Sequence, residues 1–347
     1  MKRTINIIIS LSLVLICFSC NDNLIVKESS FSKSLVAGKY VLEANDGWWH
    51  WGMAPIYDKN EKLHVFMSAI PTNGSWLTDS KIVHYIADKP EGPYQFVDTV
   101  FTSNKVSYHN PQVSKAGDVY VLVFLLKNDS TSARSQEIGL ATSKSLYGPW
   151  VESPYNPIIK ASGQMNGANV LHASNPSFLV DENGKYRIYY KSMTDKYFPK
   201  TYREISMAMS DNIEGPYTNC EENPLISYAD KHVDIEDPYV FYYKGMYYMI
   251  VEDRLGVRDM LEGHTNPEGI MKAGGWRPGL LYKSNDGLKW DRPEIAYQTN
   301  KFYFGDKLAR SERPNILWKD GKPECLFLAC EDAYSSAGFF LKIEGWD

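Results

Sequence analysis

The stretch "SNPSFLVDENGKYRIYY", residues 174–190, decides the fold. It consists of an apolar run led by a proline, a turn of Asp, Glu, Asn and Gly, and a second run rich in tyrosine. Apolar runs on both sides of a short Asn-Gly turn predict a β-hairpin. The same pattern recurs at Ala54-Pro55, Asn110-Pro111, Asp237-Pro238 and Arg313-Pro314. A unit that occurs five times along one chain predicts a repeat architecture.

A second pattern follows each of the first four hairpins. Its copies are "IVHYIADKPEGPYQF", "IGLATSKSLYGPWVE", "ISMAMSDNIEGPYTN" and "GLLYKSNDGLKWDRP". Each is an apolar strand, a polar turn and an aromatic on a further strand. Two hairpins per repeat make a four-stranded antiparallel sheet, so the sequence predicts an all-β, five-bladed β-propeller. After Pro314 there is room for only about three strands, and we expect residues 35–42 ("LVAGKYVL") to complete the last blade.

The first 34 residues have a different character. A basic start and an apolar run from Ile5 to Phe18 are typical of a signal peptide, and the run is too short for a comfortable membrane span. A small residue before Cys20 resembles the lipobox of bacterial lipoproteins, so we expect a signal peptide over residues 1–20 and lipidation of Cys20. An ordinary secretory signal is the alternative. Residues 21–34 would be a flexible tether and residues 35–347 the propeller, anchored to the bacterial outer membrane or cell surface, or periplasmic.

Composition excludes some function classes. A net charge of −5 argues against a nucleic-acid partner, and any membrane contact would be through the lipid anchor alone. The 14% aromatic content suits a β-rich core as well as a sugar site. Neither a Gly-rich phosphate loop nor a zinc-type Cys/His spacing occurs, so no cofactor is predicted. A metal ion in the central channel stays open.

Polar residues gather where the inner strands of a propeller converge. Carboxylates at one mouth provide the acid and base that glycosidic bond hydrolysis requires. Ion pairs that brace the blades, Asx turns before proline, and tryptophans of the core are the structural alternatives for the same residues. We take Glu236, Asp237 and Glu312 as candidate catalytic residues. The candidate substrate-binding residues are Asp46, His50, Trp51, His109, Asn110, Asn175, Lys191, Asp253, Arg254 and Arg313.

The phrases "HNPQV", "IGLATSKSLYGPW", "SNPSF", "HVDIEDPYVF" and "ERPNILW" give the chain its family resemblance. It resembles the five-bladed propeller glycoside hydrolases, closest to family 43 and related to families 32, 62, 68, 117 and 130. Family 43 enzymes invert with a base Asp on the first blade, a supporting Asp on the third and an acid Glu on the fourth. The resemblance implies that Glu236 is the acid. Ala54 and Asn175 stand at the other two positions, so Asp46, Asp237 or Glu312 would supply the base.

These observations predict an exported glycosidase that acts on plant or algal oligosaccharides, exo-acting and inverting. A surface sugar-binding lipoprotein without catalysis is one alternative, because the first-blade base is missing. A phosphorylase similar to family 130 is another, with Lys191, Arg254 and Arg313 available to hold phosphate.

Overall fold

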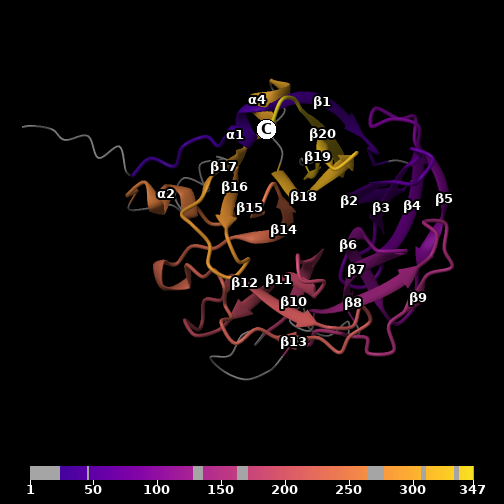
Figure 1. Cartoon of the computed structure of the whole chain (residues 1–347), viewed down its shortest axis with the longest axis horizontal. Coiled ribbons are helices and arrows are strands. Elements are labelled where there is room, and N and C mark those ends of the chain that lie inside the picture. Colours follow the sequence, from indigo (N-terminus) through magenta and orange to yellow (C-terminus); the bar gives the residue numbers. More distant parts are fainter. Residues whose placement is uncertain are drawn as a thin grey trace, which may run out of the picture.

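A computed structural model describes residues 24–44, 47–127, 136–161, 171–264, 277–305, 310–331 and 336–346. Within them the chain forms five four-stranded antiparallel sheets arranged in a ring (Figure 1). The first strand of each sheet lies nearest the centre, and the chain moves outward strand by strand. The prediction of an all-β, five-bladed propeller is confirmed.

Each blade contains one pair of repeated hairpins. Blade one is β2 (Trp48–Tyr57), β3 (Leu63–Pro71), β4 (Lys81–Ala87) and β5 (Gln95–Phe101). Blade two is β6 (Ser107–Ala116), β7 (Val119–Lys127), β8 (Gln136–Ser143) and β9 (Val151–Glu152). Blade three is β10 (Ala173–Val180), β11 (Tyr186–Thr194), β12 (Tyr202–Ser210) and β13 (Thr218–Asn219). Blade four is β14 (Glu236–Tyr243), β15 (Met246–Glu252), β16 (Gly279–Ser284) and β17 (Glu294–Tyr297).

Blade five joins the two ends of the chain. It contains β18 (Arg310–Lys319), β19 (Lys322–Glu331), β20 (Ser336–Ile343) and, as its outermost strand, the N-terminal β1 (Leu35–Val41). The β1–β20 pairing runs from Leu35 opposite Ile343 to Val41 opposite Gly338. The expected N-terminal closure is therefore confirmed. It covers a sheet edge that would otherwise be exposed.

Part of the segment assigned to a tether packs against the propeller. Helix α1 (Ser30–Lys33) begins after Ser29, whose hydroxyl caps it and also donates to the carbonyl of Ile295 in blade four. Phe31 is fully buried and meets the ring of Trp346 edge-on at 4.9 Å. Val26 is also buried, in the cluster around blade four. Residues 24–34 thus belong to the folded domain.

The hydrophobic core lies between the blades. Buried clusters join neighbouring sheets, as where Phe241 of blade four packs with Phe339 of blade five. Each sheet is covered on both faces, which explains why its second strand is apolar almost throughout: β3 and β7 are nearly continuous runs of buried residues. The short helices α1, α2 (Val257–Leu261), α4 (Asn300–Phe304) and η1 (Ala229–Lys231) lie in the connections. None of the helices in the described parts of the chain is long and apolar enough to span a membrane.

Every inner strand carries a two-residue bulge near its start. The register breaks lie between His109 and Gln112, Ser174 and Ser177, Glu236 and Tyr239, and Glu312 and Asn315. In these four blades the bulged pair is the residue before the repeated proline and that proline.

Blade one corrects the sequence alignment. Its register breaks between Trp51 and Ala54, so the bulged pair is Gly52-Met53, two residues before the position that the proline of Ala54-Pro55 suggested. The first residue of the bulge has a positive φ, 66° at Gly52. In this blade glycine supplies it instead of the Asn, Asp or Arg that precedes the repeated proline in the others.

We predict that Phe31→Ala lowers the free energy of unfolding by about 3–5 kcal/mol, because it empties a fully enclosed aromatic site between the N-terminal segment and blade five. Denaturant unfolding measures the loss. Phe302→Ala is the matched control, since Phe302 is 68% exposed, and should change stability by less than about 0.5 kcal/mol. Equal effects of the two substitutions would contradict the docking of residues 24–34.

Candidate active site

A ring of hydrogen bonds closes the central channel. It is made by the first bulge residues of four inner strands, those of blades two to five. Asn110 donates through Nδ2 to Asn175 Oδ1 at 2.8 Å, and Asn175 donates in turn to Asp237. The backbone N–H of Arg313 donates to Asp237 Oδ2 at 3.0 Å, and its guanidinium donates to the Asn110 carbonyl at 3.2 Å. Gly52 completes the circle without a side chain: a Cβ there would lie 3.3 Å from Asn110 Oδ1.

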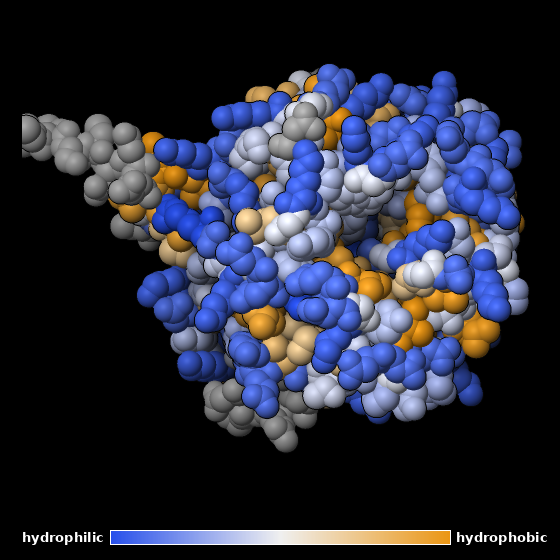
Figure 2. All heavy atoms as spheres, viewed as in Figure 1, coloured by the Kyte–Doolittle hydropathy of each residue, from blue (hydrophilic) through white to orange (hydrophobic). Residues whose placement is uncertain are grey.

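A cavity of about 610 Å³ lies against this ring. The residues that directly precede each bulge reach its wall in four blades, as Trp51, His109, Glu236 and Glu312. Loops between the second and third strands, or the strand ends beside them, supply further lining residues, among them Trp76. The face shown in Figure 2 is hollowed near the middle, where the inner strands meet. The sequence prediction of one mouth lined by blade starts and these loops matches the described part of the cavity.

Glu236 is surrounded by cations. Lys191 Nζ lies 2.7 Å and Arg203 Nε 3.1 Å from its Oε2, and Arg254 Nε lies 3.0 Å from its Oε1. Burial raises the pKa of the Glu236 carboxyl, but the attraction of these three cations outweighs burial and holds the pKa far below its usual range. Glu236 is therefore a carboxylate at neutral pH.

Glu312, in the same cavity, has the opposite protonation. Burial raises its pKa to about 8; Arg310, 2.8 Å from Oε1, lowers it, while the negative charges of Glu236 and Asp237 raise it. Glu252 pairs with Glu236 in the β14–β15 ladder, and one of its carboxyl oxygens lies within 4.8 Å of one from Glu312. Its pKa is raised strongly, first by burial and then by Glu312 and its acidic neighbours, and its Oε2 has no hydrogen-bond partner. Glu312 is thus a proton donor at neutral pH.

Two cavity histidines are held neutral. Burial lowers the pKa of His109 to about 3, with the charges of Arg313 and Lys191 adding to the effect. Burial also lowers the pKa of His172 well below its usual value. His109 shares a 2.8 Å hydrogen bond between Nδ1 and the Ser80 hydroxyl, which fixes its ring beside Trp76 at a centroid separation of 5.3 Å. Neutral imidazoles here can exchange hydrogen bonds with a polar ligand.

The structure brings most of the predicted site residues together. Three predicted residues do not line the cavity: Arg313, which forms part of the ring; His50, whose Nδ1 lies 3.1 Å from the Leu42 carbonyl; and Asp253. Asp253 accepts three backbone N–H groups at the start of α2, from Gly256, Val257 and Arg258. Asp46 and Cys20 lie outside the described residues. Those that line the cavity are Trp51, His109, Asn110, Asn175, Lys191, Glu236, Asp237, Arg254 and Glu312.

Sequence reasoning missed Arg203 and Arg310, which contact the cavity glutamates, and Glu252. Strand pairing could have found Glu252, because it lies opposite the pre-bulge residue Glu236, as the cavity residue Lys191 lies opposite Ser174. Arg203 and Arg310 lie at strand starts, and no local pattern distinguishes them.

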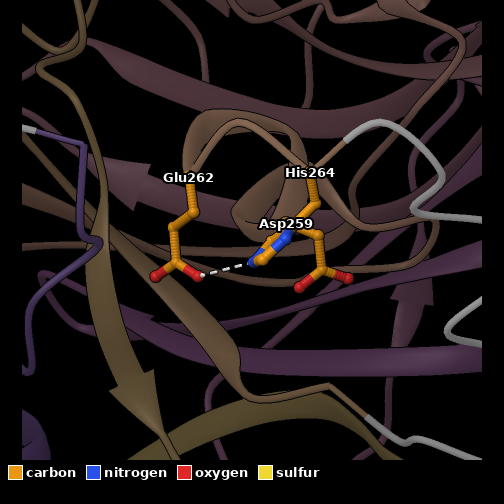
Figure 3. Close-up of side chains that lie close together, drawn as sticks. All are labelled: Asp259, Glu262 and His264. Atoms are coloured by element: carbon orange, nitrogen blue, oxygen red, sulfur yellow. Dashed lines mark ion pairs between the residues drawn. The ribbon is translucent and has the colours of Figure 1, made fainter.

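A group of side chains of the kind that can bind a metal lies at the end of α2. Asp259, Glu262 and His264 point toward one another, with ligand atoms within 4.8 Å (Figure 3). Arginines already contact both carboxylates: Arg277 Nε lies 3.2 Å from Asp259, and Arg258 Nε lies 3.2 Å from Glu262. Glu262 also accepts the backbone N–H of Val26 in the N-terminal segment. These contacts account for the group as a structural brace.

Comparison with known proteins gives one sequence relative and many similar structures. No family model matches the chain. The extracellular endo-α-(1→5)-L-arabinanase 2 of Bacillus subtilis is 26% identical over 215 residues, 58% of this chain. The chain spans 44% of the length of that curated relative.

Among solved structures, a family 117 glycoside hydrolase of the marine bacterium Zobellia galactanivorans superposes with a TM-score of 0.63. The match covers 90% of this chain and 92% of that one at 14% identity. The fold is that of the five-bladed propeller glycoside hydrolases. A GH43_1 enzyme of Xanthomonas citri, complexed with xylotriose, shares this propeller fold with a TM-score of 0.52, 13% identity and coverage of 90% and 91%. The expected resemblance is confirmed at the level of fold.

We predict that Gly52→Ala destabilises this propeller more than Gly117→Ala does. Both glycines have positive φ, 66° and 59°, so each substitution strains the backbone by about 1–2 kcal/mol. Only at Gly52 does the new Cβ crowd the ring, since nothing lies within 4 Å of a Cβ at Gly117. We expect an added loss of about 1 kcal/mol or more in denaturant unfolding. Equal losses would show that the ring has room for a fifth side chain.

Glu312→Gln should make stability less dependent on pH. The pKa of Glu312 is about 8 in the fold, above the unfolded value of about 4.3. A raised carboxyl pKa stabilises the fold fully at low pH, and this contribution is lost as pH rises through about 8, by up to about 1.4 kcal/mol per pH unit. Unfolding free energies at pH 5 and pH 8 measure the loss, which should be smaller in Glu312→Gln than in the parent. Glu61→Gln, at an exposed turn, is the control. An unchanged pH dependence in Glu312→Gln would contradict a protonated Glu312.

Proposed function

We propose that the chain is a glycoside hydrolase in which Glu312 donates the proton to the leaving oxygen. One observation carries this proposal: two carboxyl groups line the same cavity, and their surroundings hold one protonated and the other ionised at neutral pH. Such a pair is the arrangement that acid–base cleavage of a glycosidic bond requires. The resemblance to family 43 implied Glu236 as the acid, but its three cations favour the ionised form, so we assign the acid role to Glu312.

Glu236 is then the carboxylate partner that receives a proton from the attacking water. Asp237 suits that role less, because one of its carboxyl oxygens lies within 4.8 Å of one from Glu312. An inverting pair needs about 6.5–9.5 Å between its carboxyl groups to hold the water. Asp237 is also part of the hydrogen-bonded ring, where it accepts from Asn175 and from the backbone N–H of Arg313. We propose an inverting reaction, which requires that separation between the carboxyl groups of Glu236 and Glu312.

The shape of the cavity supports an exo-acting enzyme. The hydrogen-bonded ring lies at its inner end, so a saccharide chain would enter with one terminus foremost. Trp49 and Trp76 line the cavity and are 38% and 39% exposed, which leaves aromatic faces available for stacking on sugar rings. Neutral His109 and His172 would contact hydroxyl groups.

The comparisons support a plant or algal oligosaccharide as substrate. The curated relative is an extracellular arabinanase, and one structural neighbour was solved with xylotriose. An extracellular relative is also in keeping with export, and we propose export through the N-terminal signal with lipidation at Cys20.

Glu312→Gln should abolish turnover, by about a hundredfold or more, and leave the fold intact, since the amide preserves shape but has no acidic proton. The assay follows sugar release from plant and algal oligosaccharides, including arabinan fragments, with the product anomer identified by NMR. Glu61→Gln should keep parental activity. Full activity in Glu312→Gln would refute the acid assignment, and retained configuration would move the partner role from Glu236 to Asp237.

A phosphorylase is the second candidate. It is favoured by four cations that line the cavity among the residues the structure describes, Lys191, Arg203, Arg254 and Arg310. Inorganic phosphate would then replace water as the nucleophile and no base would be needed. The same assay decides between the two: turnover that requires phosphate and yields a sugar phosphate supports the phosphorylase. Saccharide binding without turnover in either condition supports the non-catalytic alternative.

A further inference from the structure

The cavity carries more positive than negative charge. Among the described residues, five cations line it or contact a lining carboxylate: Lys191, Arg203, Arg254, Arg310 and Arg313. Four carboxylates oppose them: Asp234, Glu236, Asp237 and Glu331. Glu312 and Glu252 retain their protons and the cavity histidines are neutral, so none of these adds charge. If Asp234 is ionised, five cations oppose four carboxylates and the excess is one positive charge. If Asp234 is protonated, the excess is larger.

The excess is concentrated on one wall. Lys191, Arg203 and Arg254 all approach the single carboxylate of Glu236, whereas Asp234 engages Arg203 alone. On blade five Arg310 has its own carboxylate, 2.9 Å from Glu331. In the ring Arg313 balances Asp237.

The two arginines of this wall still face the cavity. Their side chains are 24% and 22% exposed, while Glu236 is 10% exposed. Positive charge in a partly enclosed site attracts anions more strongly than it does in open water. A guanidinium also presents a planar fork of donors that matches a carboxylate.

We propose that this cavity binds a saccharide with one negatively charged ring substituent, a carboxylate, seated against Arg203 and Arg254. The inference rests on the proposed function for the saccharide and on the charge arrangement for the anion. Both guanidinium groups line the cavity and stay partly exposed, and a planar carboxylate on a sugar ring matches their donors. The substrate class is therefore an oligosaccharide that contains a uronic acid.

Calorimetry on Glu312→Gln tests the inference without turnover. The probes are matched pairs, galacturonate with galactose and glucuronate with glucose, together with galactose 6-sulfate and inorganic phosphate. We expect at least one uronate to bind about tenfold or more tightly than its neutral partner, the usual gain from one charge-assisted contact. Three results would overturn the inference. They are equal affinities within both pairs, tighter binding of galactose 6-sulfate or phosphate than of either uronate, and no binding of either uronate.

Two further substitutions in the same background locate the effect. Adding Arg254→Gln should bring the ratio of uronate affinity to neutral-sugar affinity close to one. Glu236 still pairs with Lys191 and Arg203, so we expect the fold to survive. A thermal melt verifies this. Adding Arg254→Lys, which keeps the charge, should restore part of the preference. Adding Lys185→Gln removes a cation from the outer surface of blade three, paired there with Asp211, and should leave the preference unchanged. An Arg254→Gln variant with parental preference contradicts the placement.

The outcome separates this inference from the proposed hydrolysis. Uronate preference without turnover of any acidic oligosaccharide would remove the hydrolase and keep the anion site. Turnover of neutral oligosaccharides with no preference for uronates would keep the hydrolase and remove the anion site.

Discussion

The whole arrangement depends on one closed circle of hydrogen bonds, in which Asn110, Asn175, Asp237 and Arg313 join four blades around the channel and Gly52 makes room in the fifth. Each member sits at a bulge in a positive-φ conformation, which turns its side chain toward the axis. A buried polar network of this kind is stable only when its members find partners. The circle therefore sets how the five inner strands meet.

That constraint also positions the chemistry. Because the bulge residue is fixed in the ring, the residue before it reaches the cavity wall, which places Glu236 and Glu312 on adjacent blades of one site. Their protonation differs for a local reason. Three cations from blades three and four surround Glu236, whereas Glu312 is ion-paired with Arg310 and has the buried acids Glu252 and Asp237 as neighbours. A common scaffold thus gives two glutamates opposite roles.

Much of the fold could be predicted from the sequence, because turn residues and apolar runs are local signals that repeat. The five hairpins, the closing strand and the convergence of polar positions all follow from them. The position of the bulge in blade one could not be predicted, because it lies at Gly52-Met53 and not at Ala54-Pro55. Nor could the ionisation of Glu236, which depends on Arg203 and Lys191, residues brought near it only by the packing of strands. The docking of residues 24–34 was missed because this segment lies outside the repeated hairpins, although Val26 and Phe31 are buried apolar anchors.

Neutron diffraction on a deuterium-exchanged crystal near pH 7 tests the central claim most directly, because it locates the acidic hydrogens themselves. The account predicts a deuteron on the carboxyl of Glu312 and none on Glu236, with Lys191, Arg203 and Arg254 all charged around the latter. A deuteron on Glu236 together with an ionised Glu312 would contradict it and return the acid role to the residue that the family resemblance first implied.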